Sequence, residues 1–117
     1  YGRGDLEAAS AVFVGMWGTG PDWSDLPQMA RDRIVPQIHM IPAAAPVIEE
    51  DEIGLVARLG QITCPVDLIE GSDTPPIIPS IMAGLQARIP QARRHVIPGA
   101  GHMAPITHPA EVAVSLR

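Results

Sequence analysis

The sequence predicts an α/β fold in which a helical segment precedes two strand–helix units with parallel strands. Residues 5–17 carry apolar side chains at the three- and four-residue spacing of a helix. Two short apolar runs, 66–70 and 94–97, have the composition of strands, and helical patterns follow them at 79–89 and from Pro109 onward. Strands that alternate with helices are joined by right-handed crossovers, so we expect these two strands to lie parallel.

The first half of the chain is typical of helices interrupted by proline and glycine. Residues 18–21, Gly-Thr-Gly-Pro, end the first helix. A second helical pattern covers residues 27–40, and Pro36 should kink or split it because proline removes a backbone donor. Residues 42–46 are expected to form a loop. The four acids at 49–52 suit the start of a short apolar helix, where the helix dipole favours negative charge.

The character of the chain changes at Gly60, which suggests a helical segment at 1–60 and a strand-containing part at 61–117. Two strands alone cannot complete a parallel sheet, because such sheets are covered on both faces and two strands leave most edges open. We therefore expect further strands, encoded before Tyr1. We also expect the chain taken alone to be poorly soluble or oligomeric.

The composition of the chain argues against several kinds of binding partner. The 117 residues include 8 basic and 13 acidic side chains, for a net charge of −5, without a basic cluster. This balance argues against binding to nucleic acid or an anionic membrane. The apolar run 40–48 is broken by two prolines and is shorter than the ~20 residues of a membrane helix. Cys64 is the single cysteine, which excludes an internal disulfide and a CxxC metal site.

We expect a cytoplasmic protein that acts on a small molecule, with no metal and no cofactor. The oligomeric state stays open.

The loops after the two strands carry the candidate chemistry. His102 follows the second strand in a glycine-rich loop, and Asp73 follows the first strand directly. Because open α/β sheets place their sites at the carboxyl ends of parallel strands, these loops should touch. A neutral imidazole can accept and return a proton, and a carboxylate can orient it. Each residue alone is also compatible with a purely local role in its turn.

Other polar residues are weaker candidates. His39 lies within a helical pattern and is interpreted as a packing or surface residue. His95, His102 and His108 lack a recognised ligand spacing for a metal ion. Asp67 lies within the first strand, where a buried carboxylate needs a partner.

Three segments together resemble the carboxyl-terminal third of the α/β-hydrolases. They are residues 62–73 (ITCPVDLIEGSD), residues 87–92 (ARIPQA) and residues 97–109, which include Gly-Ala-Gly-His-Met-Ala-Pro and His-Pro. The first half is similar to the cap that this superfamily inserts before its last strands. The resemblance implies a partial α/β-hydrolase fold: a helical cap at 1–60 followed by the last two parallel strand–helix units at 61–117.

The resemblance also implies residue roles. His102 is the triad histidine and Asp73 the acid that orients it, although the acid usually stands at the position of Thr74. Related hydrolases instead carry the acid after the sixth strand, which would lie before or near the start of this chain, so the identity of the acid stays open. Trp17, Trp23 and Met103 are expected to contact the substrate. The nucleophile normally lies on a Gly-x-Ser-x-Gly elbow, which these 117 residues do not contain, so we expect it upstream of Tyr1.

The implied activity is hydrolysis of a small apolar ester, lactone or similar substrate. Two alternatives remain. One is a ligand-binding relative without turnover. The other is a dehalogenase- or epoxide-hydrolase-like enzyme with an aspartate nucleophile.

Overall fold

The computed structural model describes residues 4–18 and 21–116, which fall into two compact units. The first unit spans Tyr1–Gly54 and the second Leu55–Arg117. The division therefore comes a few residues before Gly60, and the short helices at 55–61 group with the strands. At the coarse level the chain is a mixed α/β protein with a two-stranded parallel sheet, as the sequence predicts.

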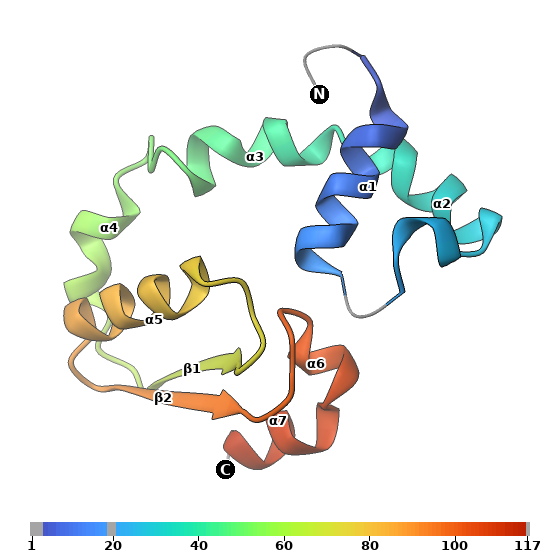
Figure 1. Cartoon of the computed structure of the whole chain (residues 1–117). Helices are drawn as coiled ribbons and strands as arrows, with labels where there is room; N and C mark the ends of the chain where they lie inside the picture. Colours follow the sequence, from blue (N-terminus) through green and yellow to red (C-terminus); the bar gives the residue numbers. More distant parts are fainter. Residues whose placement is uncertain (1–3, 19–20, 117) are drawn as a thin grey trace. The chain divides into compact units, whose positions relative to one another are not determined.

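The first unit consists of helices alone among its described residues. They are α1 (Leu6–Trp17), the 3₁₀ turn η1 (Trp23–Asp25), α2 (Gln28–Ile34), the 3₁₀ turn η2 (Val35–Gln37) and α3 (Met40–Ile48), shown in Figure 1. Asp5 caps α1, because its Oδ1 accepts a hydrogen bond of 2.9 Å from the backbone nitrogen of Ala8. The predicted break at Pro36 is confirmed, since this residue lies in η2, between α2 and α3.

The prediction of a loop at residues 42–46 is wrong, because these residues lie inside α3. Pro42 falls in the first turn of the helix, where a backbone N–H has no partner within the helix. Pro46 lacks the N–H that would donate one turn back, and its ring crowds the carbonyl there. The three alanines between the prolines have the highest helix propensity of any residue and offset part of that cost.

The second unit contains the sheet. Its elements are α4 (Leu55–Arg58), η3 (Leu59–Gln61), β1 (Val66–Gly71), α5 (Ile77–Arg88), β2 (Ala92–Ile97), α6 (Ala104–Thr107) and α7 (Pro109–Ser115). Both predicted strands and the long helix between them are confirmed, within about two residues at each end. The short α6 was not predicted, because its four residues are too few for a periodic pattern.

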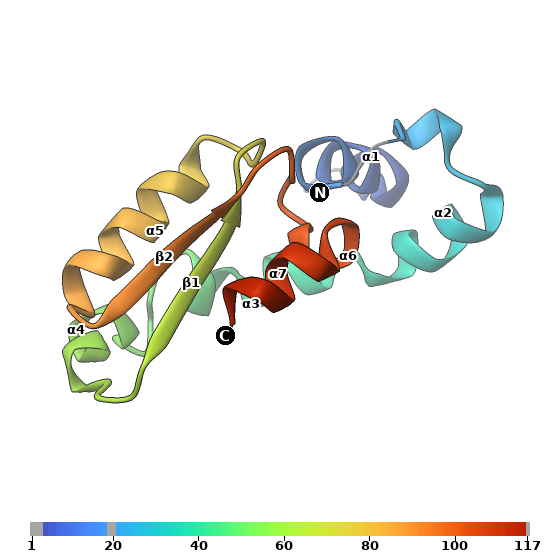
Figure 2. The same cartoon turned by 90° about the horizontal axis from the view of Figure 1, so that it is seen from below.

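β1 and β2 pair in parallel, with Val66 opposite Ala92 and Gly71 opposite Ile97. Helix α5 covers one face of this pair and α7 lies on the other face (Figure 2). On the α7 face, Ile97, Ala100 and Ala104 form a buried cluster against which Ile69 and Val112 pack. A parallel pair covered on both faces is the arrangement that βαβ units produce.

One edge of β1 has no neighbouring strand among the described residues. The backbone nitrogen of Ser72 donates to the carbonyl of Ile97, so the alternate residues Asp67, Ile69 and Gly71 direct their backbone groups toward the open side. Unpaired backbone groups of this kind can hydrogen-bond to a further strand.

In the described part of the chain, no helix combines the length and the hydropathy needed to cross a bilayer.

Candidate functional site

The loop after β2 carries His102, as the sequence predicts. Residues 98–103 turn away from the strand and lead into α6, and the side chain of His102 is exposed to solvent. Gly99 has a φ of 72°, a left-handed conformation that glycine adopts without steric cost. The turn at Gly99 therefore directs the loop back across the carboxyl end of β1.

The loop after β1 carries Asp73 and is hydrogen-bonded to the His102 loop. The backbone nitrogen of Asp73 donates to the carbonyl of Ala100 over 2.9 Å. Ser72 contributes twice, because its nitrogen donates to Ile97 at 3.0 Å and its Oγ accepts from the nitrogen of Gly99 at 2.8 Å. The prediction that the two loops touch is therefore confirmed.

Gly71 allows this close approach. A Cβ atom at this position would lie 2.0 Å from the carbonyl oxygen of Ala100 and 2.5 Å from that of Gly101. Both atoms belong to the backbone, so neither can swing aside. Only glycine is compatible with the observed crossing of the two loops.

The Asp73 carboxylate accepts a hydrogen bond of 2.8 Å from the hydroxyl of its neighbour Ser72. This contact resembles the local turn interaction that aspartate often makes. Thr74, the usual acid position of the resemblance, has a buried hydroxyl without a hydrogen-bond partner in the described structure.

The residues that are predicted to contact the substrate do not all lie in the same unit. Met103 is half-buried at the start of α6, where its carbonyl accepts from the nitrogens of Ile106 and Thr107. Trp17 belongs to the first unit and lines a groove of about 960 Å³ between α1 and α3, together with Phe13 and Met16. Trp23 is half-buried in η1 and is not among the residues that line this groove.

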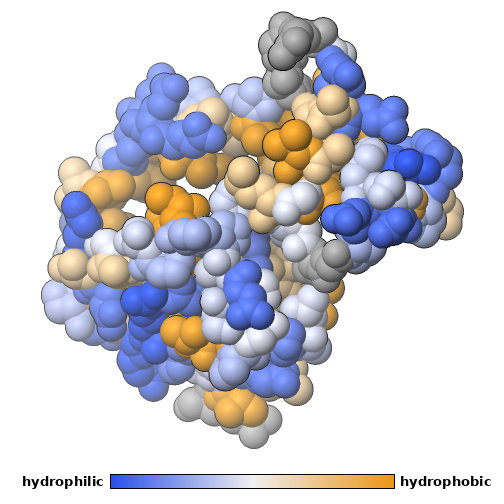
Figure 3. All heavy atoms as spheres, viewed as in Figure 1, coloured by the Kyte–Doolittle hydropathy of each residue, from blue (hydrophilic) through white to orange (hydrophobic). Residues whose placement is uncertain are grey.

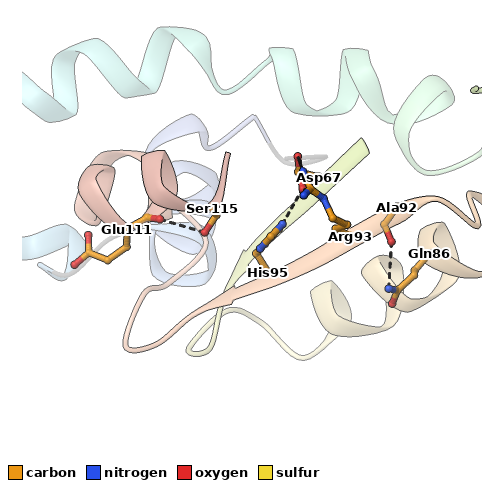
Figure 4. Close-up of polar contacts among 7 residues, drawn as sticks. All are labelled: Asp67, Gln86, Ala92, Arg93, His95, Glu111 and Ser115. Atoms are coloured by element: carbon orange, nitrogen blue, oxygen red, sulfur yellow. Dashed lines mark hydrogen bonds and ion pairs between the residues drawn. The ribbon is translucent and has the colours of Figure 1, made fainter. Parts of the chain in front are cut away.

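Sequence reasoning did not anticipate that a carboxylate and an imidazole pair within the sheet. Asp67 of β1 and His95 of β2 point toward one another from adjacent strands (Figure 4), with 2.8 Å between Oδ1 and Nε2. Because an ionised carboxylate only accepts, Nε2 of His95 is the donor. Arg93 binds the same carboxylate through Nε and Nη2, each at 3.0 Å.

His95 and Arg93 are thus the partners that the sequence predicts a carboxylate within this strand to need. Side chains alternate between the two faces of a strand, and with the observed register this alternation places Asp67, Arg93 and His95 on the same face. The register itself depends on contacts between the strands and is not visible in either segment alone.

The hydrogen bond from His95, followed by that from Arg93, lowers the pKa of Asp67 below its usual value. A carboxyl whose pKa is lower in the folded state stabilises the fold above its unfolded pKa of about 3.9. That stabilisation is lost as the pH falls through the lower folded value. We therefore expect Asp67→Asn to reduce stability at neutral pH and to flatten the decline below about pH 4.

Urea unfolding at a series of pH values measures this effect. Asp25→Asn, which removes an exposed acid from η1, serves as the control and should leave the acid decline unchanged. An Asp67→Asn curve parallel to that of the natural chain at every pH would contradict the prediction.

Glu70 is the one acid buried in the sheet, with a side-chain exposure of 2%. Its Oε1 accepts from Nε of Arg94 across the strand pair. Its Oε2 is buried and has no hydrogen-bond partner in the described structure. A buried carboxylate oxygen without a donor is costly, so this oxygen is compatible with a donor from outside the described contacts.

Among residues 4–18 and 21–116, no cluster of three or more His, Cys, Asp or Glu side chains is arranged to hold a metal ion. Comparison of the chain with known proteins yielded no matching family model, no similar curated protein and no similar solved structure.

Proposed function

We propose that the chain forms the cap and the carboxyl-terminal part of an α/β-hydrolase that acts on a small apolar ester or lactone. One observation supports this most directly: the loops that carry Asp73 and His102 follow adjacent parallel strands and are hydrogen-bonded to each other. Reacting groups in open α/β sheets lie at this end of the strands.

In this proposal His102 acts first as a base and then as an acid. The imidazole takes the proton of an attacking hydroxyl, and the oxygen of that hydroxyl bonds to the ester carbonyl carbon. The bond from that carbon to the leaving oxygen breaks, and the imidazolium returns the proton to the leaving oxygen. Water then attacks the acyl group in the same way: the imidazole takes a proton from water, the bond between the acyl carbon and the nucleophile breaks, and the imidazolium returns the proton to the nucleophile as the carboxylic acid leaves. Asp73 orients the ring through its carboxylate.

The sequence contains no Gly-x-Ser-x-Gly elbow, so this proposal requires that the nucleophile and the oxyanion donors come from polypeptide outside these 117 residues. The open edge of β1 supports this division. Its backbone groups have no partner strand among the described residues and suit a further strand. Oε2 of Glu70, which has no hydrogen-bond partner in the same part of the chain, suits a donor on such a strand. By contrast, β2 carries two arginines, which are common on strands that end a sheet.

Ester hydrolysis by the protein extended with its upstream coding sequence tests the proposal. We expect turnover of p-nitrophenyl butyrate, and we expect Asp73→Asn to lower kcat by roughly 10³–10⁴-fold, because asparagine does not stabilise the imidazolium. Asparagine can still accept the hydrogen bond from Ser72, so the turn itself should persist. An unchanged kcat and pH profile in this variant would assign Asp73 to the turn alone.

A second candidate is a ligand-binding relative without turnover. The hydrogen bond between Ser72 and Asp73 favours it, since that contact uses Oδ1 of the carboxylate within its own turn. Absence of hydrolysis by the extended protein, with retained binding of the ester, would support this candidate. An aspartate at the upstream elbow would instead point to dehalogenase- or epoxide-hydrolase-like chemistry.

A further inference from the structure

The first unit contains an apolar groove between α1 and α3. Its volume of about 960 Å³ lies within the roughly 300–1,000 Å³ of small-molecule sites. Val12 and Trp17 line it from α1, and Ile38 and Ile41 line it from the start of α3 and the segment before it. Of these residues, Ile38 is buried, with an exposure of 5%.

Several lining side chains remain open to solvent within the described structure of this unit. Val12 is 67% exposed and Ile41 is 43% exposed. Apolar side chains gather over α1 and α3 on the face seen in Figure 3. Contiguous apolar surface of this kind is unusual unless something binds to it.

The charged side chains that line the groove indicate which charge an apolar ligand should carry. Asp5, at the start of α1, and Glu49, just after α3, both belong to the lining. None of the described lining residues is arginine or histidine. The field of two carboxylates attracts a cation and repels a carboxylate, and the net charge of −5 acts in the same direction.

We propose that this groove binds an apolar small molecule with a cationic head group, of the alkylammonium class. The alkyl chain covers Val12, Trp17 and Ile41, and the ammonium group lies beside one or both carboxylates. This binding does not require the proposed catalytic residues His102 and Asp73, because every residue that it uses lies in the first unit.

Tryptophan fluorescence of the full chain tests the proposal. The chain has two tryptophans, so Trp23→Phe leaves Trp17 as the sole reporter in the groove. Titration with dodecyltrimethylammonium and with dodecanoate, each below its micelle concentration, compares two chains of equal length and opposite charge. We expect saturable binding of the ammonium that is about tenfold tighter than binding of the carboxylate, since each exposed charge contributes a few-fold.

Two variants separate charge from apolar contact. The double variant Asp5→Asn and Glu49→Gln should remove the tenfold preference, while asparagine keeps the helix cap. Glu50→Gln, at an exposed acid beside Glu49 and outside the lining, makes the matched control and should keep the preference. Ala45→Phe fills the groove and should weaken both ligands at least tenfold.

Equal affinities for the two ligands in the natural chain would overturn the proposal. A preference that persists in the double variant would also overturn it, as would the absence of saturable binding. If neither ligand showed saturable binding, a protein segment would become the candidate occupant of the groove. Far-UV circular dichroism checks that each variant keeps its helices. The double variant replaces only exposed side chains, so its result stands even where Ala45→Phe disturbs packing.

Discussion

Replacement of His102 by alanine is expected to reduce kcat for ester hydrolysis about 10³-fold or more in the protein extended with its upstream coding sequence. The imidazole is the proposed base, and loss of one member of a catalytic set removes most of the benefit of the set. The fold should survive, because the His102 side chain is exposed. Steady-state hydrolysis of p-nitrophenyl butyrate, with circular dichroism as a folding check, measures the effect.

His108→Ala is the matched control for this experiment. His108 lies close by in the sequence, between α6 and α7, and its ring contacts the Thr107 hydroxyl at 2.8 Å. It has no part in the proposed chemistry, so its replacement should leave kcat within about twofold. Full activity of the His102→Ala enzyme would remove this histidine from the mechanism.

Gly71→Ala is expected to destabilise the second unit strongly, by about 3 kcal/mol or more. The added methyl group would lie 2.0 Å from the Ala100 carbonyl oxygen, far inside van der Waals contact. The two loops would have to separate. That movement breaks the hydrogen bond from the Asp73 nitrogen to Ala100 and displaces a fully buried residue of the core cluster. Urea unfolding, followed by circular dichroism, measures the change.

Gly101→Ala provides the comparison, because a Cβ at that position meets nothing within 4 Å and its φ is not positive. This variant should unfold near the urea concentration of the natural chain. If Gly71→Ala unfolded there too, the close contact between the loops would not contribute to stability.

Local signals predicted most of the secondary structure. The helix at α1, the split at Pro36 and both strands follow from periodicity and proline placement, which act within a few residues. The same reasoning failed at residues 42–46, where rules about single prolines outweighed the helix propensity of the alanines. It also missed α6, which is a single turn started by the loop before it.

The candidate site was predictable only in part. The alternation of strands and helices indicated that Asp73 and His102 follow neighbouring strands, because parallel topology sends both carboxyl ends to the same edge. The partners of Asp67 could not be assigned in this way. They depend on the pairing of Asp67 with Arg93 and of Ile69 with His95, a register that is set by contacts more than twenty residues apart.

The amino-acid sequence by itself determined the class of the fold, the order of its elements and the loops that carry the candidate chemistry, because these follow from local propensity and from the handedness of crossovers. Only the tertiary structure decided that Gly71 lies against Ala100, that His95 pairs with Asp67, and that α1 and α3 enclose a groove with two carboxylates. Each of these features joins residues that are distant in the chain. Their energies come from packing and geometry that no short segment specifies.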